Sequence, residues 1–190
     1  MLLNLRRGLI FSLIAIALAF AFAYAGTGLA QVAFKSQADG SITAKGSTLI
    51  GQNWSSPEWF HGRPDDIGPY AKEGDNPLEA NGVSGESAAQ NLGPRSQVLL
   101  DNTRALVAYW HKLGVVPTAD LVTTSGSGYD PDITPEDATV QIPMVSRATG
   151  ISATALARLI ARESHGAQLG FLGSSYIDVL QLNEALAKLR

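Results

Sequence analysis

Leu9–Tyr24 (LIFSLIAIALAFAFAY) is the stretch that decides how this chain is organised. It is the densest part of an uncharged segment from Gly8 to Phe34. A helix over positions 8 to 34 would be about 40 Å long, more than the hydrocarbon core of a bilayer, which is about 30 Å thick. Arg6 and Arg7 precede the segment, and positive charge on a short flank places that end in the cytoplasm. The stretch predicts a membrane anchor over residues 1–34, followed by an extracytoplasmic domain.

A cleavable signal peptide is the alternative interpretation of this segment. Ala21-Phe22-Ala23 and Ala23-Tyr24-Ala25 both have the small-x-small form that a signal peptidase recognises. Cleavage there would release a secreted soluble binding or hydrolytic protein. The apolar character continues to Phe34, beyond the core of about 7–15 residues that a signal peptide needs, and this favours the anchor.

The composition after the apolar segment limits the possible partners. All 17 Asp and Glu lie beyond residue 34, with 12 of the 14 Lys and Arg, so residues 35–190 carry a formal charge of 12 − 17 = −5. Nucleic acid is not an expected partner, because its binding requires a basic surface. The chain contains no cysteine, which excludes disulfides, thiol chemistry and cysteine metal sites.

Residues 35–190 predict a single mixed α/β domain of about 155 residues, so the fold class is expected to be α+β behind one transmembrane helix. Apolar spacing and glycine stops predict helices at 97–112, 135–149, 153–164 and 183–190. Thr134 and Ser152 are expected to cap two of them. Short strands are expected at 41–50, 120–124 and 176–180, and a long loop at 65–96.

Ser125 and Ser127 are the first candidates for nucleophilic chemistry. They lie in the segment TTSGSG, which lacks the glycines of the nucleophile motif G-x-S-x-G. A tight turn on Gly126 and Gly128 is therefore favoured, with Gly128 expected at a positive φ.

Metal ligands are also poorly grouped. His61, His111 and His165 are isolated in the sequence, without the i, i+4 spacing of a helical zinc pair. Asp130-x-Asp132 begins like a calcium loop, but Pro135 occupies the sixth place, where such a loop needs glycine. The residues predict no catalytic centre and no metal site.

Six blocks in register give the chain a resemblance over nearly its whole length to the C subunit of the Kdp potassium-transporting P-type ATPase (the KdpC family). The blocks are GSTLIGQ at 46–52, WFHGRP at 59–64, NLGP at 91–94, VPTADLVTTSGSGYDPDITP at 116–135, LGFLG at 169–173 and VLQLN at 179–183. The chain departs from the family pattern at Tyr129, Asp132 and Met144, and over the segment Ser84–Gln90. Any role of Asp132 or of that segment is not carried over from the family.

The resemblance implies a non-catalytic accessory subunit of an ATP-driven, high-affinity potassium uptake complex in the bacterial cytoplasmic (inner) membrane. Its implied partners are the potassium-channel-like Kdp A subunit, the ATP-hydrolysing Kdp B subunit and the small Kdp F peptide. The family is described as a catalytic chaperone that raises the ATP affinity of the B subunit. ATP is therefore implied only through the complex, and potassium is the transported ion. Because the predicted topology separates the domain from cytoplasmic ATP, a cap over the potassium entrance is favoured.

The glycine-rich turns and an aromatic cluster are the candidate contacts with these partners. Trp and Tyr are common at binding surfaces, although the same aromatic side chains could equally supply core packing. The candidate contact residues are Trp59, Phe60, Arg63, Ser125, Ser127 and Asp130.

Overall fold

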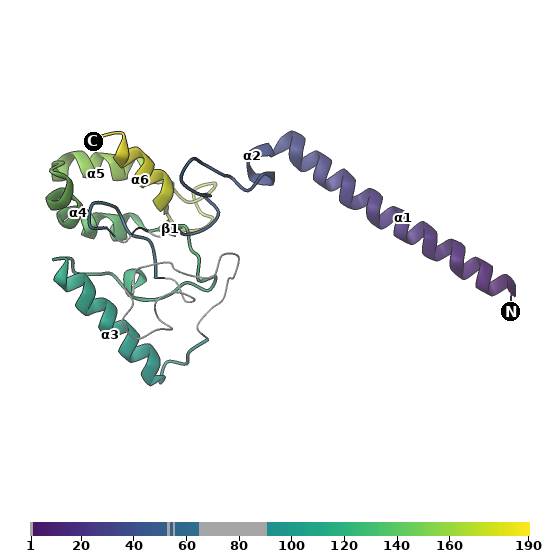
Figure 1. The fold of residues 1–190 in the computed structure, drawn as a ribbon, viewed down its shortest axis with the longest axis horizontal. Helices are drawn as coiled ribbons and strands as arrows, with labels where there is room; N and C mark the ends of the chain where they lie inside the picture. Colours follow the sequence, from purple (N-terminus) through teal and green to yellow (C-terminus); the bar gives the residue numbers. More distant parts are fainter. Residues whose placement is uncertain (1, 53, 55, 65–90) are drawn as a thin grey trace. The chain divides into compact units, whose positions relative to one another are not determined.

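A computed structural model describes residues 2–52, 54, 56–64 and 91–190 of the chain (Figure 1). The chain divides into two compact units, Met1–Ile42 and Thr43–Arg190. The predicted loop at 65–96 and the altered segment Ser84–Gln90 lie wholly or largely outside the described residues.

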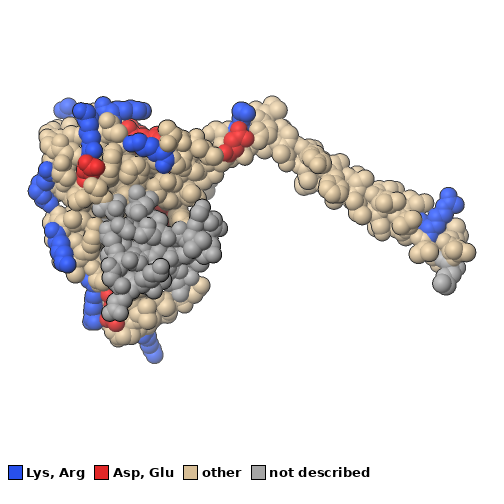
Figure 2. All heavy atoms as spheres, viewed as in Figure 1, with Lys and Arg blue, Asp and Glu red and all other residues tan. Residues whose placement is uncertain are grey.

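The first unit consists of α1 (Leu2–Ala33), a continuous helix of 32 residues, and the short α2 (Lys35–Ala38). No residue of α1 is buried. Figure 2 shows charged side chains near the two ends of this unit and none along the middle of α1. By length and composition α1 is able to cross a membrane.

The second unit combines helices with a very small sheet (Figure 1). A two-residue strand β1 (Asp132–Ile133) pairs antiparallel with β2 (Ile177–Asp178), which sets Asp132 opposite Asp178 and Ile133 opposite Ile177. The helices are α3 (Gln97–Lys112), α4 (Pro135–Thr149), α5 (Ala153–Glu163) and α6 (Val179–Ala187), with a short 3₁₀ turn η2 (Asp120–Val122). This combination of elements is consistent with the predicted α+β class.

Local capping signals explain where the helices begin. The Thr134 side chain accepts a hydrogen bond from the Asp137 amide at 3.1 Å, and the Asp137 carboxylate accepts one from the Thr134 amide at 2.8 Å. This capping box satisfies two amides that the first turn leaves without an intrahelical partner. Ser152 caps α5 by accepting from the Ala155 amide, and Gly150 ends α4 at φ 75°. The predicted bounds of α3 and α4 are confirmed, and α5 ends one residue earlier than predicted.

Four predicted elements are wrong or displaced. Asp120–Thr124 is not a strand: residues 120–122 form η2, and the Leu121 carbonyl accepts from the Trp110 indole at 3.0 Å instead of from a neighbouring strand. The strand predicted at 176–180 is limited to β2, because the Asp178 carboxylate accepts from the Gln181 amide at 2.7 Å and so starts α6 at Val179. The helix expected at 183–190 therefore begins four residues earlier. Within 41–50 the structure has isolated bridge residues and no strand.

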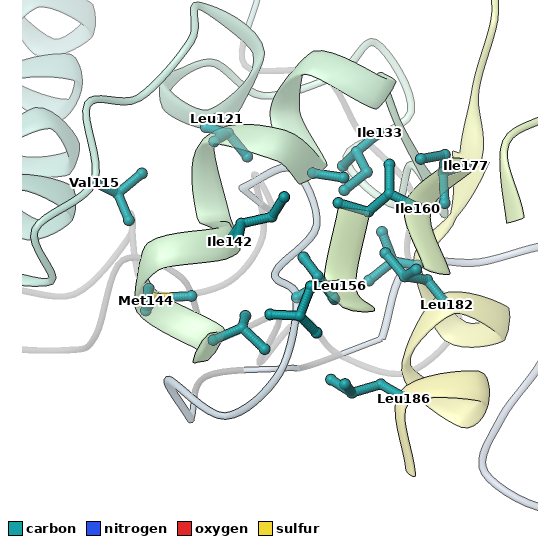
Figure 3. Close-up of a cluster of buried hydrophobic side chains, with 14 of the residues drawn as sticks. Val115, Leu121, Ile133, Ile142, Met144, Leu156, Ile160, Ile177, Leu182 and Leu186 are labelled. Carbon is teal, nitrogen blue, oxygen red and sulfur yellow. The ribbon is translucent and has the colours of Figure 1, made fainter. Parts of the chain in front are cut away.

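The core lies where α4, α5 and α6 pack together and against the small sheet. Figure 3 shows the side chains of Ile142, Leu156 and Leu182 within one cluster of buried apolar groups. Trp110 of α3 and Phe60 are completely buried in the same core. Each such side chain contributes about 1.5–3 kcal/mol through the apolar area removed from water. This packing fixes the positions of the segments around Phe60 and Asp130.

Candidate partner-binding site

Two buried amide side chains hold the backbone of the segment that contains Phe60 and His61. The Asn183 side chain accepts from the Phe60 amide at 2.9 Å and donates to the Phe60 carbonyl at 2.8 Å. The Gln141 side chain makes the same pair of bonds to His61, at 2.8 and 3.0 Å. Asn183 and Gln141 are fully buried. Their side chains therefore supply the hydrogen bonds that water would otherwise make to the backbone amides and carbonyls of Phe60 and His61. The segment is thereby fixed against α4 and α6 without belonging to a sheet.

Arg63 follows this segment and joins it to the glycine-rich turn. Its guanidinium donates to the Asp130 carboxylate at 3.3 Å and to the carbonyls of Thr123 at 3.4 Å and Thr124 at 3.1 Å. An Asp120 carboxylate oxygen lies 3.9 Å away. The fork of an arginine can reach several acceptors at once, which a lysine cannot do. Arg63 therefore fixes the residues on both sides of Ser125.

The hydroxyl groups of Ser125 and Ser127 shape the turn between these anchoring points. The Gly128 amide donates to the Ser125 hydroxyl at 3.0 Å, and the Tyr129 amide donates to the Ser127 hydroxyl at 3.2 Å. Gly128 has φ 72°, which confirms the predicted positive φ. The two hydroxyl oxygens are 3.2 Å apart. The Ser125 hydroxyl thus serves the turn as an acceptor.

The segment around Gly51 packs on the other side of the same turn. Its amide donates to the Tyr129 carbonyl at 2.8 Å. A Cβ atom added to Gly51 would lie 3.0 Å from the Asp130 carbonyl oxygen, a backbone atom with little freedom to move. The pocket between Gly51, Arg63 and Asp130 has a volume of about 10 Å³, enough for at most about one water molecule. Val179 and Leu180 also line this pocket, so four of the blocks that carry the family resemblance meet here in close packing.

Trp59 belongs to a different part of the surface. Its ring centroid lies 5.1 Å from that of Trp54. Two cations approach its ring, the Lys45 ammonium at 5.0 Å and the Arg190 guanidinium at 4.4 Å. Arg190 also forms an ion pair with Glu58 at 3.1 Å. A ring with cations at these distances gains cation–π attraction, and the contacts connect the end of the chain to the segment before Phe60.

The six predicted contact residues are thus divided among three environments. Arg63 and Asp130 contact each other beside the Ser125–Ser127 turn, Phe60 lies in the core, and Trp59 lies among cations. Their role as partner contacts stays a prediction. The sequence reasoning missed Asn183 and Gln141. Asn183 ends the VLQLN block, which was a usable signal, whereas nothing in the sequence distinguished Gln141.

Three titratable groups near this region have altered pKa values. Burial lowers the pKa of the His61 imidazole to about 4, although its hydrogen bond with the Ser56 carbonyl at 3.0 Å favours the charged form. Partial burial and, to a smaller extent, the nearby Asp130 and Asp178 charges together raise the pKa of the Asp132 carboxyl to about 6, while His165 acts in the opposite direction. Burial also raises the pKa of Asp178. At neutral pH His61 is therefore uncharged, while the β1–β2 pair sets two carboxylates opposite each other.

The part of the chain that the structure describes contains no group of three His, Asp or Glu side chains placed to hold a metal ion.

A groove of about 340 Å³ lies beside the Ser125 turn. It is lined by Asn91, Leu92, Leu99, Thr123, Thr124, Ser125 and Gly126. The NLGP block and the glycine-rich turn therefore share one surface depression.

Comparison with known proteins supports the resemblance over almost the whole chain. The family model of KdpC, described as "K+-transporting ATPase, c chain", matches residues 5–188. The chain is 41% identical over 171 residues to the Potassium-transporting ATPase KdpC subunit of Gloeobacter violaceus, covering 86% of this chain and 84% of that protein. The equivalent protein of Geobacter sulfurreducens is 43% identical over 169 residues, with 84% of each chain covered. That of Koribacter versatilis is 40% identical over 164 residues, covering 83% of this chain and 79% of the relative. The chain therefore belongs to the KdpC family, the c chain of the K+-transporting ATPase.

Proposed function

We propose that the chain is the non-catalytic accessory subunit of an ATP-driven potassium pump in a bacterial inner membrane. In this proposal α1 spans the membrane once with its N-terminus in the cytoplasm, and residues 43–190 lie outside. The proposed partners are the channel-like A subunit, the ATP-hydrolysing B subunit and the small F peptide. The names of the relatives, each a potassium-transporting ATPase subunit, support this assignment.

The observation that carries the proposal is the apolar helix α1, none of whose residues is buried, with arginines near its start. A helix with 32 residues and no buried side chain leaves a large apolar area uncovered, and a bilayer removes that area from water. Arg6 and Arg7 favour the cytoplasm for the N-terminal end. The connection from Phe34 to Thr43 spans at most about 30 Å when extended. The second unit is therefore held close to the outer membrane surface.

We assign the second unit to the potassium entrance of the channel-like subunit, which it covers and stabilises. ATP is hydrolysed on the cytoplasmic side of the membrane, so the proposed topology keeps this unit away from the nucleotide. The increase in ATP affinity described for the family would then be transmitted through the assembled complex. Contacts with the channel-like subunit would come from the surface around Arg63, the Ser125–Ser127 turn and the adjoining groove.

Affinity purification tests the assembly. Full-length tagged protein is extracted in detergent from membranes of cells that express the whole pump, and its companions are identified by mass spectrometry. We expect two large membrane subunits, and deletion of the chain should abolish growth at limiting potassium in a strain without another high-affinity uptake system. Recovery of the chain without either large subunit would refute the assignment.

Protease treatment of intact spheroplasts tests the topology. We expect external protease to degrade the second unit and to leave a cytoplasmic control protein intact. A protected second unit would show that it lies in the cytoplasm. N-terminal sequencing of the mature protein distinguishes the anchored protein from the secreted alternative. The secreted alternative requires a mature protein that begins near Gly26, whereas the anchored protein keeps the residues before it.

A further inference from the structure

A short hairpin between α5 and α6 presents apolar side chains to solvent. At its base His165 and Tyr176 exchange backbone hydrogen bonds of 2.8 and 3.0 Å, and their rings stack with centroids 5.0 Å apart. At its far end Gln168 and Leu172 exchange two more, both 2.8 Å. The three residues between them, Leu169, Gly170 and Phe171, form a closed loop. The hairpin is therefore held in one shape at both ends.

The apolar tip of this hairpin consists of Leu169, Phe171 and Leu172, which are 82%, 76% and 49% exposed. The segment from Ser164 to Ile177 contains no Asp, Glu, Lys or Arg. Isolated exposed leucines are common on proteins, but three large apolar side chains within four residues of an uncharged segment form a patch. Such patches mark surfaces that another molecule covers.

The backbone of Leu169 gives independent support. Its φ is 54°, a conformation that side chains other than Gly and Asn adopt at a cost of about 1–2 kcal/mol. The Leu169 side chain is 82% exposed, so it gains little from packing within the chain that would offset this strain. Strained residues that gain nothing within their own chain are typical of binding sites.

We propose that the apolar tip inserts into an apolar pocket on the outer face of the channel-like subunit; this inference rests on the proposed function. A protein pocket is favoured over lipid because a bilayer surface needs no fixed loop shape, whereas a pocket does. The charge also argues against anionic lipid, since residues 35–190 carry −5 and the hairpin has no Lys or Arg. An uncharged tip matches an apolar pocket.

The choice of Leu169→Asn separates binding from folding. Asn tolerates a positive φ better than Leu, so the unfolding midpoint of the full chain in detergent should stay the same or rise. The apolar contact with the partner is lost, and with Phe171→Asn added we expect recovery of the large subunits from membranes to fall about tenfold. Val116→Asn is the matched control, because Val116 is 77% exposed and lies outside the hairpin. Its complex should form at the level of the unmodified protein.

Each outcome of the experiment decides the inference. Full recovery of the subunits by the Leu169→Asn, Phe171→Asn variant, while the unmodified protein also captures them, would overturn the inference and leave the proposed function intact. Failure of the unmodified protein to capture any large subunit would refute the proposed function itself. A lower unfolding midpoint for Leu169→Asn would show that the side chain serves the fold, and would also overturn the inference.

Two further measurements address other occupants of the tip. A Phe171→Trp variant of the full chain is placed in vesicles with brominated lipid and without the other subunits. We expect no quenching beyond that of the unmodified protein, and strong additional quenching would assign the tip to the bilayer and overturn the inference. The oligomeric state of the chain in detergent is the second measurement. A dimer that Leu169→Asn dissociates would assign the tip to a second copy of the chain and would also overturn the inference.

Discussion

Asn183→Leu is the substitution that most directly tests how the segment around Phe60 is held. Leucine has the same branching and the same number of side-chain heavy atoms as asparagine, so the change removes two hydrogen bonds, of 2.9 and 2.8 Å, without opening a cavity. The Phe60 amide and carbonyl would then remain buried without partners, at about 1–3 kcal/mol each. We expect the free energy of unfolding to fall by about 3 kcal/mol.

Asn183→Asp makes the same test depend on pH. A protonated carboxyl can accept from the Phe60 amide and donate to the Phe60 carbonyl, as the amide of Asn183 does. An ionised carboxylate cannot donate, and its charge would be buried. The folded state therefore raises the pKa of the new carboxyl, so its stabilising contribution is present at low pH and is lost as the pH rises. We expect a loss of about 1 kcal/mol at pH 5 and about 3 kcal/mol at pH 8.

Urea unfolding of the full chain in detergent, followed by tryptophan fluorescence, measures both effects because Trp110 is completely buried. Gln97→Leu is the control, since Gln97 is an exposed amide on α3 that donates to Asp101 at 2.9 Å, and it should change stability by less than about 0.5 kcal/mol. A loss below about 1 kcal/mol for Asn183→Leu, or an Asn183→Asp variant whose stability relative to the unmodified protein does not change between pH 5 and 8, would refute the reasoning.

Three other substitutions test neighbouring parts of the site. Asp132→Asn removes a carboxyl whose pKa rises from 3.8 to about 6 on folding. The charged carboxylate therefore destabilises the folded state as the pH rises above about 4. After allowance for solvent screening, urea unfolding should show the variant to be more stable than the unmodified protein by about 1 kcal/mol at pH 7 and equally stable at pH 3.5. Gly128→Val places a branched side chain at φ 72° and should lower the free energy of unfolding by about 2 kcal/mol. Gly126→Ala is the control, because the space around its Cβ position is open, and it should leave stability unchanged. Equal thermal unfolding midpoints for the two variants would contradict this expectation. Arg63→Lys keeps the charge but cannot reach Asp130 and both carbonyls together, so a loss of about 1 kcal/mol is expected, and unchanged unfolding would argue against the role of the guanidinium fork.

The helix boundaries could be predicted because their causes lie within a few residues of each other. Thr134 and Asp137 form the capping box of α4 on their own, and Gly150 ends that helix in a conformation that favours glycine. The apolar helix α1 was equally evident, since its signal is an uninterrupted run of composition. In each case the physical reason for the element is contained in the segment that forms it.

The candidate site could not be predicted in the same way because its contacts join distant segments. Asn183 and Phe60 are 123 residues apart, Gln141 and His61 are 80 apart, and Arg63 and Asp130 are 67 apart. The strand expected at 120–124 failed for the same reason. A β-branched run becomes a strand only when another strand pairs with it, and the Leu121 carbonyl is instead bonded to the Trp110 indole.

The blocks that carry the family resemblance differ in what they do within the chain, and this difference separates scaffold from surface. Gly51, Arg63 and Asn183 use hydrogen bonds to hold other segments of the same chain. The LGFLG block forms a closed loop whose large side chains, Leu169 and Phe171, point into solvent. Apolar side chains that lie outside the core of their own chain are removed from water only when another molecule covers them. Among the blocks whose side chains the structure describes, this one therefore has the strongest physical reason to contact a partner through apolar side chains. The Arg63 region, whose polar surface is also proposed to contact the channel-like subunit, holds the domain in the shape that presents both.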